Sequence, residues 1–153
     1  AHFIAGEMIK DGADNLEIQE SIFQSNTEDR IRLLGYAISE KLVVIKELNV
    51  AYIKLSMNDL DKFQFQQGDT EGLVNYALSI KKVSLAVLMI EKGKSVKFSF
   101  RSSGNCPANL VAKEHFNGGG HRNAAGGECF STLKEAENTF LAVISEYKDQ
   151  LTL

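Results

Sequence analysis

The first quarter of the chain has the spacing of hydrophobic residues that is typical of helices. Up to residue 42, hydrophobic side chains recur every three or four positions, which places them on one side of a helix. The clearest series comprises Ile31, Leu34, Ile38 and Leu42. Two shorter helices are predicted before it, over residues 1–10 and from Asp14 to about Phe23, because Asp11-Gly12-Ala13 interrupts the pattern. This segment has little hydrophobic variety, so we expect a linker or a docking face.

From residue 42 onward the pattern indicates strands. Residues 42–46 and 50–55 are rich in β-branched side chains, and the short polar segment between them predicts a hairpin. Residues 85–90 are hydrophobic on both faces, which is typical of a central strand covered on both sides. Hydrophobic and polar side chains alternate over residues 96–101, so Lys97, Ser99 and Arg101 are expected to share one face.

Helices are predicted between and after these strands. They fall over residues 58–63, 69–80, 110–115 and 132–151, and a last short strand over residues 128–130. Asp69 and Thr132 are the predicted N-caps, and Glu135 completes a capping box with Thr132. The fold class that results is α/β: a mixed β-sheet flanked by helices, preceded by a helical linker.

Composition narrows the class of protein. The chain has 153 residues and is 44% hydrophobic, enough for one domain with its own core. A net charge of -3 argues against coating a nucleic acid duplex by bulk charge, but allows a local basic pocket. The longest hydrophobic run is far shorter than the roughly 20 residues of a membrane span. Two cysteines make no disulfide framework, so we expect a soluble, cytoplasmic protein without membrane contacts.

The segment 116–127 contains five of the 12 glycines, three of them consecutive at Gly118, Gly119 and Gly120. Consecutive glycines can expose backbone N–H groups to an anion, and His121 and Arg122 add side-chain donors directly afterwards. We therefore predict a phosphate-binding loop. The alternative is that the glycines allow a tight turn, close packing or a dimer contact. The segment is not a P-loop, because no Lys-Ser or Lys-Thr follows at the required spacing.

Arg101 is the second candidate, because it ends a strand on the polar face. Its guanidinium could bind a phosphate through two hydrogen bonds, although an ordinary exposed arginine is the alternative. Asp69 and Glu71 could bind a ribose hydroxyl or serve as caps. The chain's three histidines, His2, His115 and His121, have no nearby carboxylate or thiolate cluster, so neither a metal site nor a catalytic site is predicted in this chain.

These motifs resemble a known family. Residues 118–126 resemble the GGGHxxAAG signature of the DHH-associated domain, the C-terminal half of DHH-family phosphoesterases. Residues 69–74 and Arg101-Ser102 resemble two further segments of that family. Their order and spacing are similar to the branch that contains nanoRNases, 3′-phosphoadenosine 5′-phosphate phosphatases and cyclic-dinucleotide phosphodiesterases.

The resemblance implies domain boundaries within the chain, and it implies that substrate and metal ions are bound by different domains. Residues 1–25 would be the last helices of a preceding DHH domain, residues 26–41 the linker helix, and residues 42–153 the DHH-associated, substrate-binding domain. The family has a cleft between the two domains, with two Mn²⁺ ions on the DHH side. The Asp-His-His motif of that side is not in this sequence. The resemblance therefore implies that this chain binds no metal and is inactive in isolation.

The resemblance also assigns roles to the candidate residues. Arg101 and Ser102 would contact a phosphate or base, Gly118, Gly119 and Gly120 would donate backbone hydrogen bonds, and His121 and Arg122 would face the cleft. His121 is also a candidate for assisting the transition state. The substrate would be a short RNA or a small nucleotide, the main partner the DHH domain of the same polypeptide, and a homodimer is considered. The alternative function is a stand-alone module that binds nucleotides or nucleic acids.

Overall fold

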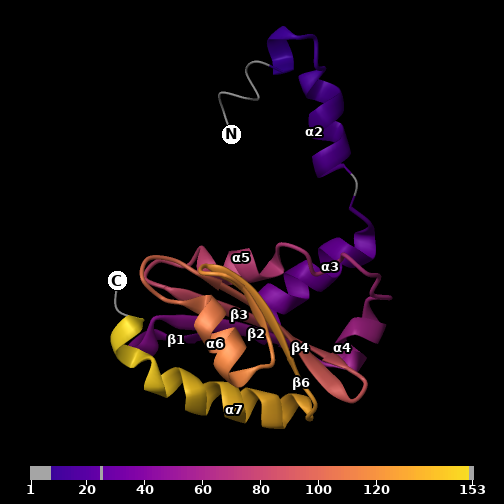
Figure 1. Cartoon of the computed structure of the whole chain (residues 1–153). Coiled ribbons are helices and arrows are strands. Elements are labelled where there is room, and N and C mark those ends of the chain that lie inside the picture. The colour runs from indigo at the N-terminus through magenta and orange to yellow at the C-terminus, as the bar shows by residue number, and fades with distance from the viewer. Residues whose placement is uncertain (1–7, 25, 152–153) are drawn as a thin grey trace.

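The computed structural model describes residues 8–24 and 26–151, and these form one mixed β-sheet with helices on both sides (Figure 1). The strands are β1 (Leu42–Ile45), β2 (Val50–Leu55), β3 (Leu85–Lys92), β4 (Ser95–Ser102), β5 (Gly119–His121) and β6 (Ala124–Cys129). The helices are α2 (Asn15–Phe23), α3 (Glu28–Tyr36), α4 (Met57–Lys62), α5 (Leu73–Leu78), α6 (Ala108–His115) and α7 (Leu133–Glu146), with shorter helical segments η1 (Ala37–Lys41), η2 (Lys46–Leu48) and η3 (Lys148–Gln150).

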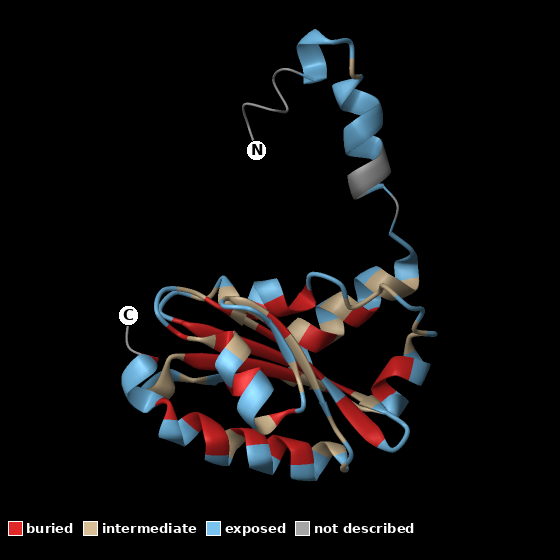
Figure 2. Cartoon of the chain, viewed as in Figure 1, coloured by how far each residue is buried: buried red, intermediate tan, exposed pale blue. Residues whose placement is uncertain are grey.

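The strand order is β1-β2-β3-β4-β6-β5. Strands β2 and β3 are parallel, and the other neighbours are antiparallel. The predicted α/β class and the predicted β1–β2 hairpin are therefore confirmed. Strand β3 lies inside the sheet, and residues 85–90 are all buried, as their hydrophobic character on both faces predicted (Figure 2).

Two hydrophobic cores lie on opposite faces of the sheet. The first lies under α6 and α7 and contains Phe98 and Phe100 of β4 with Phe116 and Phe140. The second lies under α3, α4 and α5 and takes the alternate side chains of β2 and β3. Because Val96, Phe98 and Phe100 enter the first core, Lys97, Ser99 and Arg101 point to the other face, as predicted.

Helix α7 begins with the predicted capping box, and α3 also has a side-chain cap. Thr27 accepts a hydrogen bond from the Arg30 amide, and Thr132 and Glu135 form a complete capping box. Asp14 likewise caps α2. Helix α2 stands clear of the sheet and its residues 15–20 are exposed (Figure 2). The helix predicted over residues 1–10 lies largely outside the described residues.

Two element starts lie furthest from the prediction. The helix predicted from Asp69 begins after Gly72, because the Asp69 carboxylate instead accepts a hydrogen bond of 2.7 Å from the Gln66 amide in the preceding turn. The strand predicted over residues 128–130 begins at Ala124 and ends at Cys129, because the whole of this segment pairs with β4. None of the helices within residues 8–24 and 26–151 is both long and hydrophobic enough to cross a membrane.

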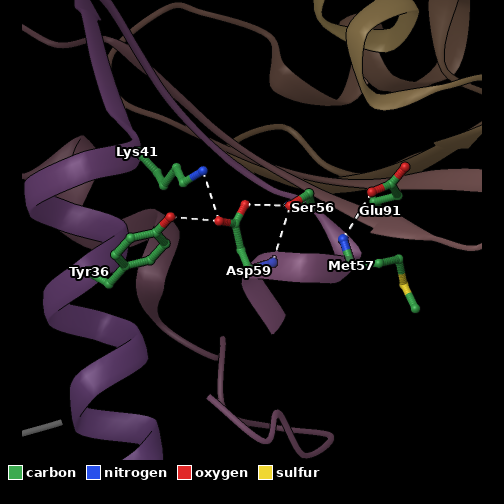
Figure 3. A network of polar contacts seen from close by, with 6 residues as sticks. All are labelled: Tyr36, Lys41, Ser56, Met57, Asp59 and Glu91. Atoms are coloured by element: carbon green, nitrogen blue, oxygen red, sulfur yellow. Dashed lines mark hydrogen bonds and ion pairs between the residues drawn. The ribbon is translucent and has the colours of Figure 1, made fainter. Parts of the chain in front are cut away.

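A polar network joins the end of α3 and η1 to α4 (Figure 3). The buried carboxylate of Asp59 accepts hydrogen bonds from the Tyr36 hydroxyl at 2.7 Å and from the Ser56 hydroxyl at 2.7 Å. It also pairs with the Lys41 ammonium at 2.8 Å. Asp59 thus connects the end of α3 and η1 to the start of α4.

Candidate functional site

Strand pairing places Arg101 and His121 on the same face of the sheet. Arg101 lies opposite Ala124, and Ala124 lies opposite His121. Directly opposite residues of antiparallel strands project to the same face, so the three form one row across β4, β6 and β5. Two strand spacings separate the backbones of Arg101 and His121 by roughly 10 Å. The small side chain of Ala124 leaves the space between them open.

The next row along the same strands has almost no side chains. It consists of Ser99 on β4, Gly126 on β6 and Gly119 on β5. A Cβ atom added to Gly119 would meet nothing within 4 Å, and one added to Gly126 would only approach the Phe98 carbonyl at 3.5 Å. This part of the face is therefore a floor of nearly bare backbone next to Arg101 and His121.

The other glycines of the segment are required by close packing. A Cβ atom on Gly118 would lie 2.0 Å from the Gly126 carbonyl oxygen, and one on Gly127 would lie 2.6 Å from the Phe116 carbonyl oxygen. Gly120 has a φ of 145°, and a Cβ atom added to it would lie 2.6 Å from the Ala124 carbonyl oxygen. The packing interpretation accounts for these three, while Gly119 and Gly126 leave open space. The segment is a β-hairpin rather than a loop, and the Gly118 amide already donates to the Ala112 carbonyl at 3.0 Å.

A cavity of about 550 Å³ adjoins Arg101 on the side away from the hairpin. Its walls are Phe65, Gln67, Gly68, Thr70, Glu71, Gly72, Val74, Leu88, Ile90, Lys92, Lys97, Ser99 and Arg101. The segment before α5 thus meets the polar face of β4 here. Arg101 stands between this cavity and the glycine hairpin, whose residues do not line it.

The donors of Arg101 are largely free. The half-buried guanidinium donates through Nη1 to the neighbouring Phe100 carbonyl at 2.9 Å. Among the residues that the structure describes, no carboxylate pairs with it. Lys92 and Lys97 in the same cavity also form no ion pair within the described part of the chain, so this face presents positive charge to a ligand.

Comparison with known proteins identifies the fold family. Residues 43–149 match the DHHA1 domain family. The chain belongs to this family. DHHA1 domains are typically the C-terminal part of DHH-family phosphoesterases, so the resemblance seen in the glycine signature is confirmed at this level.

Solved structures similar to this DHHA1 domain include an exopolyphosphatase-related protein from Bacteroides fragilis. The two share 40% identity with a TM-score of 0.92, and the match covers 98% of this chain but 44% of that protein. This chain therefore spans less than half the length of that relative. The C-Ala domain of Aquifex aeolicus alanyl-tRNA synthetase matches 72% of this chain and 97% of that domain at 16% identity, with a TM-score of 0.49. No curated protein sequence matches the chain.

The other predicted site residues of this DHHA1 domain lie apart from the Arg101–His121 row. The Ser102 hydroxyl is buried and donates to the Cys106 carbonyl at 2.8 Å, since Ser102 alternates with Arg101 and projects to the opposite face. Arg122 lies in the exposed turn between β5 and β6, with Nη2 3.5 Å from the Asn105 side chain. Asn123 fixes this turn by donating to the Ser102 carbonyl at 3.1 Å.

Neither a metal-binding cluster nor a reactive thiolate at Cys106 is found among the residues of this domain that the structure describes. No group of three or more His, Cys, Asp or Glu residues within the described ranges could hold a metal ion, so the residues present do not fit a manganese site. His115 lies near the Tyr147 hydroxyl at 3.3 Å, away from His121. Burial raises the pKa of Cys106 to about 11, which keeps this thiol protonated.

The alternation along β4 also points to two residues that line the cavity. Lys97 and Ser99 alternate with the core residues of β4 and were predicted to share the face of Arg101, but were not named as ligands. Both line the cavity. Glu71 also lines it, whereas Asp69 is held in the preceding turn.

Proposed function

We propose that this DHHA1 domain binds a phosphate of a short RNA or a small nucleotide between Arg101 and His121. The row Arg101–Ala124–His121 carries the proposal. It places one donor side chain, Arg101, on one side of an open space and another, His121, on the other side. A guanidinium with free donors suits bidentate phosphate binding. The bare backbone at Gly119 and Gly126 offers room for a sugar or base beside the phosphate.

The proposal makes this chain the substrate-binding half of a metal-dependent phosphoesterase of the nanoRNase or 3′-phosphoadenosine 5′-phosphate phosphatase type. A DHH domain of the same polypeptide would hold two Mn²⁺ ions and activate water, which is chemistry that this chain's residues do not supply. His121 and Arg122 would lie on the side of the cleft opposite those metals. The free cysteines Cys106 and Cys129 are consistent with a cytoplasmic location, which belongs to the same proposal.

Binding of the dinucleotide pApA to the 153-residue chain tests the proposal by calorimetry. Arg101→Gln should weaken binding by about 1.5–3 kcal/mol, the usual cost of losing a charged hydrogen bond. Arg32→Gln is the matched control, since Arg32 is exposed and its ion pair in the structure is with Glu28 on the same helix, α3. Equal affinities of Arg101→Gln and the wild type would contradict the proposal.

Turnover separates binding from catalysis. The chain alone, supplied with Mn²⁺, should release no mononucleotide from pApA, because the described residues provide no metal site. Robust release would contradict the assignment of this chain as a binding half. Binding without release, combined with release by a protein that also carries a DHH domain, would support it over a stand-alone module.

A further inference from the structure

A second cavity, of about 370 Å³, lies at the opposite edge of the sheet from β5. It is lined by Val44, Lys46, Asn49, Ile80, Lys81, Lys82 and Val83. These residues come from β1, from the β1–β2 connection and from the segment between α5 and β3. Helix α5 therefore lies between the two cavities: residues before and at its start line the first, and residues after its end line the second.

Three lysines give the second cavity a positive charge that no ion pair within the described part of the chain neutralises. Lys46, Lys81 and Lys82 form no ion pair with any described residue, in a chain whose net charge is -3. Glu47 follows Lys46 in sequence but does not line the cavity. Val44, Ile80 and Val83 form a hydrophobic part of the wall beside Asn49, and Val44 is 38% exposed there. Positive charge beside an exposed hydrophobic surface suits an anion that carries an organic group.

The two segments that carry the lysines are held in place by specific backbone contacts. Asn49 and Lys82 have φ angles of 54° and 72°, which non-glycine residues rarely adopt. The Ser84 amide donates to the Asn49 carbonyl at 2.8 Å, and the Asn49 side chain donates to the Leu151 carbonyl at 3.1 Å. The walls of the cavity are thus fixed relative to each other.

Strand register places Val44 and Arg101 in the same row of the sheet, with the buried Ala51 and Ala86 between them. A single row crosses the whole sheet through Val44, Ala51, Ala86, Arg101, Ala124 and His121. Val44 lies three strands from Arg101, a separation of roughly 14 Å. The Ser103 amide donates to the Ser84 carbonyl at 2.9 Å, so the strand end that carries Arg101 runs beside the segment that carries Lys81 and Lys82.

We propose that the second cavity binds a further phosphate of the same oligonucleotide, distal to the phosphate at Arg101. This rests on the proposed function at Arg101. Lysine ammonium groups bind phosphates as point charges, and the hydrophobic wall accepts a base or ribose. Lys46, Lys81 and Lys82 thereby select for chain length: a dinucleotide engages the Arg101 site alone, and a longer RNA engages both.

The test compares pApA with a 5′-phosphorylated hexaadenylate in binding to the 153-residue chain at several salt concentrations. The variant Lys81→Gln/Lys82→Gln should leave pApA affinity unchanged and weaken hexaadenylate binding by roughly tenfold, with the slope of log K against log[salt] reduced by roughly 0.7 for the one lost phosphate contact. The control Lys94→Gln/Lys113→Gln removes the same charge from residues that line neither cavity, and should alter neither ligand's binding.

Three results would overturn the inference. They are equal hexaadenylate affinity in the Lys81→Gln/Lys82→Gln variant and the wild type, equal weakening of both ligands, and lysine-dependent binding of a polyglutamate peptide without any effect on RNA. Arg101→Gln tests the underlying function separately, because that variant should weaken the binding of pApA as well as that of the hexaadenylate. If Arg101→Gln weakens binding but Lys81→Gln/Lys82→Gln does not, only the second site is rejected.

Discussion

The Tyr36 hydroxyl donates a hydrogen bond of 2.7 Å to the Asp59 carboxylate and thereby joins the last residue of α3 to the middle of α4. Lys41 and Ser56 contact the same carboxylate. Only 8% of Asp59 is exposed, so this charge depends on its partners for solvation. This carboxylate therefore helps to hold the end of α3 against α4, together with Leu33 and Ala37, which pack into the core.

Asp59→Ala should destabilise the domain by about 3 kcal/mol, because it removes a largely buried acceptor and leaves the Lys41 ammonium without its partner. The measurement is urea denaturation followed by circular dichroism. Asp61→Ala, an exposed position on the same helix, is the control and should shift stability by less than about 0.5 kcal/mol. Equal stabilities of the two variants would contradict the role given to Asp59.

The same carboxylate makes stability depend on pH in the acid range. Burial by itself raises the pKa of Asp59, but the hydrogen bonds from Lys41, Tyr36 and Ser56 outweigh it and hold the pKa below its ordinary value. A lowered folded-state pKa stabilises the fold above the unfolded value of about 3.9, and that contribution disappears as pH falls below it. Between pH 4 and pH 2 the wild type should therefore lose stability more steeply than Asp59→Asn, by up to about 1.4 kcal/mol per pH unit. Parallel pH profiles would show that Asp59 does not titrate in this range.

The sequence pattern predicted correctly those features that depend on residues close to one another in the chain. The alternation over residues 96–101 gave the correct faces of β4, and the spacing of Thr132 and Glu135 gave the start of α7. The pair Ser56 and Asp59 carries the same capping-box signal and forms the same box, although the helix was predicted to begin slightly later. In each case the interacting groups lie within a few residues of one another.

The site could be predicted only in part because it depends on contacts between distant strands. Nothing near Arg101 in sequence shows that it will lie in one row with His121, since this follows from the register of β4, β6 and β5. A glycine can be required by close backbone packing or can border open space, and the sequence does not distinguish the two cases. Gly118 is small because another backbone occupies its side-chain space, whereas Gly119 borders open space.

Alanine substitutions should separate these two kinds of glycine. Gly118→Ala places a methyl group against the backbone of β6, and overpacking of this kind costs about 1–3 kcal/mol or more. Gly119→Ala should leave stability nearly unchanged, because a Cβ atom there meets nothing within 4 Å. Thermal denaturation of both variants measures the difference. Equal melting temperatures for Gly118→Ala and the wild type would show that the hairpin can separate from the Gly126 carbonyl at little cost.

Ala124→Leu fills the space between Arg101 and His121 without removing either donor. Ala124 is only partly buried and projects to the open face, so the larger side chain should fold without strain and weaken pApA binding at least tenfold by excluding the phosphate. Ala142→Leu, at an exposed position of α7, makes the same change away from the open face and should bind like the wild type. Calorimetric titration measures affinity, and a melting curve of each variant confirms folding. A folded Ala124→Leu variant with unchanged affinity would mean that the ligand does not lie between Arg101 and His121, and the binding surface would then have to be sought in the cavity beside β4.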